Sequence, residues 1–75
     1  MTKQDFLKEL EDLLQRDEVC SENDLLEKYE EWDSLSKMSL IAFFNKHFNI
    51  KLTMQSFKNI NKVSDLIALS NGNIQ

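Results

Sequence analysis

The 75-residue sequence has no proline, one glycine, one cysteine and one histidine. Because Cys20 has no second cysteine to pair with, a small secreted fold held by internal disulfides is excluded. No apolar run is long enough to span a bilayer or to form a signal peptide, so we expect a cytoplasmic protein. Neither His47 nor Cys20 has a second metal-binding residue at a useful spacing, and we predict no metal site.

The sequence also lacks a self-sufficient catalytic set. A chain of this length forms one small domain, residues 1–75, with little room for a deep cleft beside its core. It contains no glycine-rich phosphate loop. Ser34, His47 and Asp33 cannot form a catalytic triad, because thirteen residues along one helix separate Ser34 from His47 by about 20 Å. We therefore expect a monomeric protein that is not an enzyme.

The net charge of −4 is unevenly distributed along the chain. Residues 1–32 carry eleven acidic and four basic side chains, whereas residues 33–75 carry two acidic and five basic ones. The acidic half argues against a protein that binds the phosphate backbone of a nucleic acid. It is typical either of a solvated helix surface or of a surface that partner enzymes recognise by charge.

The spacing of apolar residues predicts an all-α fold, a small four-helix bundle with three main helices and one short helix. Thr2 and Asp5 form a weak capping box before a first helix of about Lys3 to Arg16. Residues 17–32 form a long loop between the first two helices. Four apolar or aromatic side chains should pin this loop to the core: Leu25, Leu26, Tyr29 and Trp32.

The second helix begins near Ser34, with Asp33 as its N-cap. Its apolar residues form a wide stripe, which indicates a central helix that packs against more than one neighbour. We expect Leu35 and Met38 to turn inward, while Ser34 in the first turn stays accessible to solvent.

The C-terminal third predicts one short and one longer helical segment. Thr53 can cap a short helical turn that carries Met54 and Phe57. Asn61 can cap the last helix, which should end at Asn71-Gly72. Four residues of this helix should face inward: Val63, Leu66, Ile67 and Leu69.

The start of the second helix suits a phosphate-linked modification of Ser34. A phosphodiester on its Oγ would lie at the positive end of the helix macrodipole, which favours anions by about 0.3–1 kcal/mol. These physical arguments permit the modification without requiring it. Taken alone, the motif favours an ordinary N-cap pair of Asp33 and Ser34, because Asp-Ser-Leu is short enough to occur often by chance.

The residues around Ser34 resemble the acyl and peptidyl carrier protein family, whose small four-helix domains carry phosphopantetheine. In that family an Asp-Ser-Leu start is followed by spaced apolar positions along the second helix and the link after it. The matching residues here are Asp33, Ser34, Leu35, Met38, Leu40, Ile41, Phe48, Ile50 and Leu52. Further along, Ile60, Val63, Leu66 and Ile67 match the last helix of the family. The resemblance covers nearly the whole chain.

The resemblance implies that Ser34 carries a covalent 4'-phosphopantetheine arm, added from coenzyme A by a phosphopantetheinyl transferase. Asp33 would help to recruit the transferase, and Leu35 would border the arm. Acyl-loading and acyl-transferring enzymes would be the other partners, because the arm carries acyl groups as thioesters. The core would shelter those groups among Leu40, Phe44 and Ile60.

The chain departs from the fatty-acid carriers of the family along the second helix. Those carriers present acidic side chains there, whereas this helix has no acid after Asp33. Lys37, Met38 and Ser39 are the candidate residues for partner docking. With Trp32 before the Asp-Ser-Leu motif, this favours a dedicated carrier of a specialised pathway over a general fatty-acid carrier. The main alternative is a helical adaptor that is never modified at Ser34.

Overall fold

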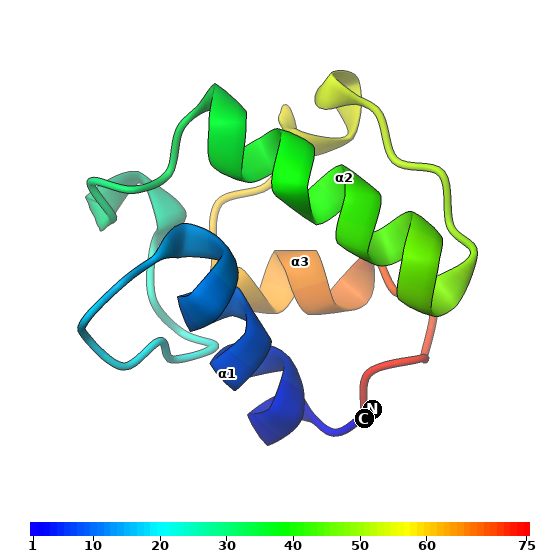
Figure 1. Cartoon of the computed structure of the whole chain (residues 1–75), viewed down its shortest axis with the longest axis horizontal. Coiled ribbons are helices and arrows are strands. Elements are labelled where there is room, and N and C mark those ends of the chain that lie inside the picture. The colour runs from blue at the N-terminus through cyan, green and yellow to red at the C-terminus, as the bar shows by residue number, and fades with distance from the viewer.

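The computed structural model describes residues 1–75 and contains three α-helices. These are α1 (Lys3–Leu14), α2 (Ser34–Phe48) and α3 (Val63–Ala68). Two short 3-10 turns are η1 (Leu26–Lys28) and η2 (Met54–Phe57). The predicted all-α fold is confirmed, but the short fourth helix is only the 3-10 turn η2. Figure 1 shows α1 and α2 arranged around α3, with the two chain ends side by side.

Helix α1 begins as predicted and ends two residues early. The Thr2 hydroxyl accepts a hydrogen bond from the Asp5 backbone N–H at 3.1 Å, which caps the helix start. At the other end Gln15 takes a left-handed conformation with φ of 55°. The backbone N–H groups of Gln15 and Arg16 then bond to carbonyl groups of the last turn, which stops the helix at Leu14.

The long loop is pinned to the core, as the sequence predicts. Leu26 and Tyr29 are buried, and Leu25 and Trp32 are partly buried. Three backbone hydrogen bonds of 2.9–3.1 Å also tie the loop to residues 61–64, including an isolated bridge between Leu25 and Lys62. The loop therefore holds a fixed path between α1 and α2, including its residues just before Ser34.

The core is centred on aromatic side chains of α1 and α2. Phe6 of α1 meets Phe44 of α2 edge-to-face, with ring centroids 6.2 Å apart, and both rings are fully buried. Leu40 is also fully buried one turn before Phe44. Trp32 from the loop packs edge-to-face on Phe57 of η2 at 5.8 Å. Helix α2 contacts both α1 and η2, so it packs against more than one neighbour, as its dense apolar pattern predicts.

Helix α3 starts differently from the prediction. Its N-cap is Lys62, one residue later than the predicted Asn61. The Asp65 carboxylate reaches back and accepts hydrogen bonds from the backbone N–H groups of Asn61 and Lys62 at 2.9 and 3.0 Å. The α-helix ends at Ala68, and turns continue the chain to Asn71-Gly72, where both residues have positive φ.

Candidate functional site

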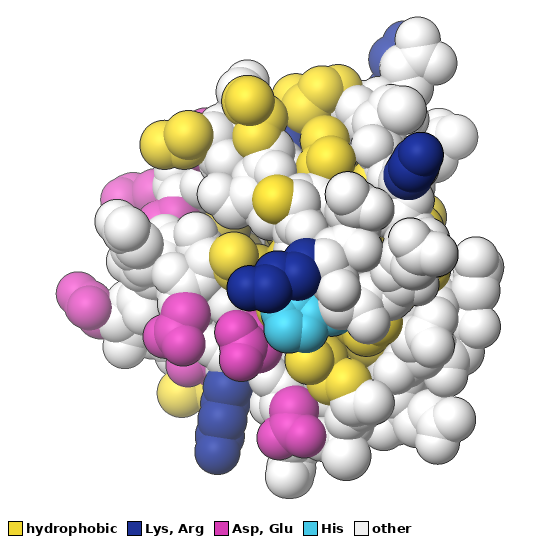
Figure 2. Space-filling model, turned by 45° about the vertical axis from the view of Figure 1, so that its right-hand side comes forward, with side chains coloured by type: hydrophobic (Ala, Val, Ile, Leu, Met, Phe, Trp, Pro, Cys, Tyr) yellow, Lys and Arg dark blue, Asp and Glu magenta, His cyan; other side chains and the backbone are white.

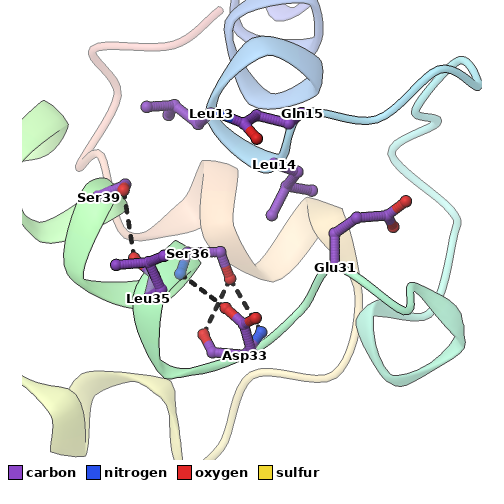
Figure 3. Close-up of a pocket in the computed structure, with 8 residues that line it drawn as sticks. All are labelled: Leu13, Leu14, Gln15, Glu31, Asp33, Leu35, Ser36 and Ser39. Atoms are coloured by element: carbon purple, nitrogen blue, oxygen red, sulfur yellow. Dashed lines mark hydrogen bonds between the residues drawn. The ribbon is translucent and has the colours of Figure 1, made fainter.

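The start of α2 is fixed by a reciprocal pair of hydrogen bonds. The Asp33 carboxylate accepts from the Ser36 backbone N–H at 2.9 Å, and the Ser36 hydroxyl accepts from the Asp33 backbone N–H at 3.0 Å. Figure 3 shows both bonds, with Ser36 also donating to the Asp33 carbonyl oxygen at 2.9 Å. Asp33 is therefore the N-cap that the sequence predicts, and Ser36 completes a capping box.

Ser34 is the first residue of this capped helix, and its side chain is exposed. Its hydroxyl makes no hydrogen bond within the chain, in contrast to Ser36 and Ser39 nearby. The backbone N–H groups of the first turn of a helix have no partner inside the helix, so an anion on Ser34 Oγ would meet donors. Ser34 thus combines access, a free hydroxyl and a rigid position.

Ser36 is a functional residue that the sequence reasoning missed. Its side chain is only 5% exposed, and its hydroxyl accepts from the backbone N–H of Asp33 and donates to the Asp33 carbonyl oxygen. The signal that could have revealed it is the Asp-x-x-Ser spacing, since a side-chain oxygen at the third helical position can close a capping box. Three bonds between Asp33 and Ser36 hold the backbone on both sides of Ser34.

The expectation that Leu35 and Met38 turn inward is wrong. Leu35 is 73% exposed and Met38 is 60% exposed. The buried residues of the helix, such as Leu40, set its inner face, and residues two positions apart point about 200° apart on an α-helix. Met38 therefore points to solvent because Leu40 points to the core. Both side chains extend from the same end of α2 as Ser34, where a partner could contact them.

The other candidate docking residues are held by local contacts. The Lys37 ammonium lies 5.4 Å from the centroid of the Trp32 ring, within the range of a cation–π contact. The Ser39 hydroxyl donates to the Leu35 carbonyl oxygen at 3.2 Å. Both side chains are half-buried, so Met38 is the most exposed of the three.

The three residues expected to shelter an acyl group do not line a common cavity. Leu40 and Phe44 are fully buried among other side chains, and neither lines any pocket. Ile60 is partly buried and lines a surface pocket beside Leu25 and Trp32. Phe44 packs against the rings of Phe6, Phe43 and Phe48.

A cavity of about 320 Å³ lies between the end of α1 and the first turns of α2. Figure 3 shows Leu13 and Leu14 of α1, with Gln15 just after the helix, on one side and the α2 residues on the other. Glu31 stands at its edge and accepts a hydrogen bond from Arg16 at 3.1 Å. This ion pair fixes the chain two residues before Asp33.

The loop before the site contains a buried polar cluster. Arg16 lies over the Tyr29 ring at 3.9 Å, and the Tyr29 hydroxyl donates to the Asp24 carboxylate at 2.7 Å. Burial, together with that hydrogen bond, raises the pKa of the Tyr29 phenol. Cys20 is 2% exposed, and burial raises the pKa of its thiol, so it is an unreactive core residue.

The surface charge follows the division seen along the chain. Residues 34–64 contain five lysines and no acidic residue, whereas residues 1–33 contain twelve acids. Figure 2 shows acidic side chains on the left and lower parts of one face and none on its right-hand part. No three His, Cys, Asp or Glu side chains are grouped as metal ligands. No helix is both long enough and apolar enough to cross a membrane.

Compared with protein-family models, with curated proteins and with solved structures, the chain has no match.

Proposed function

We propose that this chain is an acyl carrier whose Ser34 bears a 4'-phosphopantetheine arm. The observation that carries the proposal is the exposed and unbonded hydroxyl of Ser34 at the first position of a capped helix. The residues there fit a phosphate-linked group, because a helix N-terminus favours an anion and nothing covers the serine. The resemblance of the sequence around Ser34 to carrier proteins supplies the identity of that group.

A separate phosphopantetheinyl transferase would supply the catalytic machinery. Ser34 Oγ would accept the phosphopantetheine phosphoryl group from coenzyme A, a transfer that depends mainly on positioning and charge neutralisation. Asp33 would have two roles, since its carboxylate caps α2 and also presents negative charge beside the reacting hydroxyl. When bound, the arm supplies a terminal thiol that carries acyl groups as thioesters.

The charge of α2 favours a dedicated carrier. After Asp33 the helix carries Lys37, Lys46 and His47 and no acid. Enzymes that recognise acidic carriers through basic patches would meet like charge here, which costs specificity and association rate. We therefore propose acyl-loading and acyl-transferring enzymes of a specialised pathway as partners, with exposed Leu35 and Met38 in their contact surface.

Intact-mass measurement tests the proposal. The purified protein is incubated with coenzyme A, Mg²⁺ and a transferase of broad specificity, and we expect the mass to rise by one phosphopantetheine group. Ser34→Ala should abolish the gain. Ser39→Ala is the matched control, because Ser39 lies on the same helix and its hydroxyl bonds only to the Leu35 carbonyl oxygen.

Two outcomes of the same measurement would contradict the proposal. A protein that stays at its apo mass under these conditions contradicts the carrier function, and a Ser34→Ala variant that still gains mass contradicts the site. In the first case the exposed Leu35 and Met38 support the alternative function, a helical adaptor that binds a partner protein without modification.

A further inference from the structure

Two cavities run along the side of α2 that faces α1. The first, of about 320 Å³, is lined at the start of α2 by Asp33 and Leu35. The second, of about 360 Å³, is lined further along by Ala42 and Lys46. Both are lined by Leu13 of α1 and Ser39 of α2, so they are adjacent parts of one groove, which we call the α1–α2 groove.

We propose that the α1–α2 groove binds the phosphopantetheine arm when the arm is not engaged by an enzyme. This inference rests on the proposed function, since it requires an arm on Ser34. It differs from the sequence expectation, which placed the shelter among Leu40, Phe44 and Ile60 in the core. Both cavities are open to solvent, so an arm could enter and leave them freely.

The groove begins beside the residues that flank the attachment point. Asp33 and Leu35, the two neighbours of Ser34 in the chain, both line its near end. Leu35 is 73% exposed, so its side chain offers an apolar surface over which the arm would pass to reach Ser39. The apolar pattern of α2 does not explain why Leu35 is exposed. Contact with the arm would explain it.

The length of the groove matches the length of the arm. Twelve residues of α2 separate Ser34 from Lys46 at the far end, a rise of about 18 Å. Fourteen bonds join Ser34 Oγ to the terminal sulfur, and an extended chain that gains about 3.3–3.6 Å for every three bonds would span about 16 Å. The thiol would therefore lie near Lys46 and His47.

The chemistry of the groove also matches that of the arm. The arm carries two amides and a hydroxyl separated by methyl and methylene groups. The groove alternates polar and apolar surface, with Gln15 and Ser39 as polar partners and Leu13, Ala42 and Phe43 as apolar contacts. The Ser39 hydroxyl oxygen accepts no hydrogen bond within the chain, so it can accept one from an amide of the arm.

The opposite side of α2 offers no comparable path. The pocket that contains Ile60 is lined by residues of the loop and of the segment before α3, and no residue of α2 contributes to it. An arm on Ser34 that turned toward η2 would lie on exposed surface around Met38 and Met54. Only the α1 side of the helix holds a cavity whose lining includes the two chain neighbours of Ser34.

Amide chemical shifts of the apo and holo proteins test the inference. The holo protein is first shown to be fully loaded by its intact mass, so that a failure to load counts against the proposed function alone. We then expect shift changes along the groove, at Leu13, Gln15, Ser39, Ala42 and His47. Changes confined to the first turn of α2, or changes that lead toward Met54 and Phe57, would overturn the inference while the carrier function stands.

The reactivity of the terminal thiol gives a second readout. A docked arm reacts only through its undocked fraction, so alkylation of the holo protein should be several-fold slower than alkylation of free pantetheine. Ala42→Trp places a large side chain over the groove from an exposed position and should restore the fast rate. Alkylation of the apo protein measures the background reaction of the buried Cys20 thiol.

Asn45→Trp is the matched control for this substitution. Asn45 is also exposed on α2 but lines no cavity, and it points about 60° away from Ala42 around the helix. We expect the slow alkylation rate to persist in this variant. Equal rates in the wild type, both variants and free pantetheine would show that the arm does not dock in the groove.

Discussion

Neighbouring side chains in the first turn of α2 have different roles. Asp33 and Ser36 use their side-chain oxygens to satisfy backbone N–H groups, whereas the Ser34 hydroxyl between them has no structural task. A hydroxyl with no role in stability can be modified without loss of the fold. This separation distinguishes the proposed site from an ordinary helix start, in which the serine itself is the cap.

The two roles of Asp33 can be separated by substitution. Asp33→Ala removes the acceptor for the Ser36 N–H, and we expect the free energy of unfolding to fall by about 0.5–2 kcal/mol. Asp33→Asn keeps a good N-cap and should retain nearly all the stability. Urea denaturation measures these changes, and transferase loading of the same variants measures recruitment. If Asp33→Asn loads as fast as the wild type, the charge of Asp33 has no part in recruitment.

Asp65 predicts a pH dependence of stability. Hydrogen bonds from the backbone N–H groups of Lys62 and Asn61 lower the pKa of its carboxyl below the ordinary value of 3.8. A lowered pKa in the folded state means that the contribution is present above 3.8 and is lost as the pH falls through the lower value. The free energy of unfolding, measured by urea titration from pH 6 downward, should therefore decline at acid pH.

Substitution of Asp65 tests whether it causes part of that decline. Asp65→Asn should be less stable than the wild type near neutral pH, with the difference shrinking toward acid pH. Asp17→Asn is the control, because Asp17 is exposed and makes no hydrogen bond. A constant difference between Asp65→Asn and the wild type at every pH would contradict the assignment.

At the scale of the elements, spacing in the sequence predicts where helices form better than which way they face. The starts of α1 and α2 follow from Thr2 and Asp33, because an N-cap is a local interaction. The inward face of α2 does not follow, since its apolar residues surround most of the helix. Only the packing of Phe44 against Phe6 of α1 decides that Leu35 and Met38 face solvent.

Contacts between distant segments were the least accessible to sequence reasoning. The turn η1 depends on where the loop meets residues 61–64, and the burial of Cys20 depends on where the loop meets α1 through the Glu11 side chain. The α1–α2 groove was also unforeseen, because it is formed between two helices joined by the long loop. What the sequence did reveal of the site is local: Asp33 as the cap and Ser34 as an accessible hydroxyl.

The long loop should contribute strongly to stability in spite of its irregular backbone. Leu26 in η1 is 1% exposed, and Leu26→Ala should lower the free energy of unfolding by about 2–5 kcal/mol. A chain of this size has a total of only about 4–11 kcal/mol, so thermal denaturation will detect the loss readily. Val19→Ala in the same loop is the control, since Val19 is 79% exposed and should change stability little. Similar losses for both variants would show that the loop is not pinned at Leu26.

At the scale of the whole molecule, charge and partner choice are linked. The acids of residues 1–33 and the lysines of residues 34–64 give the protein a dipolar surface in spite of a net charge of only −4. Such a distribution orients an approaching partner more than it strengthens binding. If Ser34 is modified as proposed, a partner enzyme would meet Asp33 at the helix start and lysines beyond it, so its own surface would have to accommodate both signs.

The two ends of the chain are joined by backbone hydrogen bonds. The backbone N–H of Lys3 donates to the Gln75 carbonyl oxygen at 3.1 Å, and the Gln75 N–H donates to Met1 at 2.9 Å. Between these bonds Ile74 is 5% exposed and belongs to the core, although it lies one residue from the last position. Its backbone N–H donates to the buried Ser70 hydroxyl at 3.1 Å.

This closure predicts that Ile74 matters as much as a residue in the middle of a helix. Ile74→Ala should lower the free energy of unfolding by about 2–5 kcal/mol, because it leaves a cavity that a small core cannot refill. Gln75→Ala is the control, since the bonds of Gln75 to Lys3 and Met1 are made by its backbone and survive the substitution. Thermal unfolding followed by circular dichroism compares the two variants. If Ile74→Ala melts with the wild type, the C-terminal segment frays in solution and the core is complete without it.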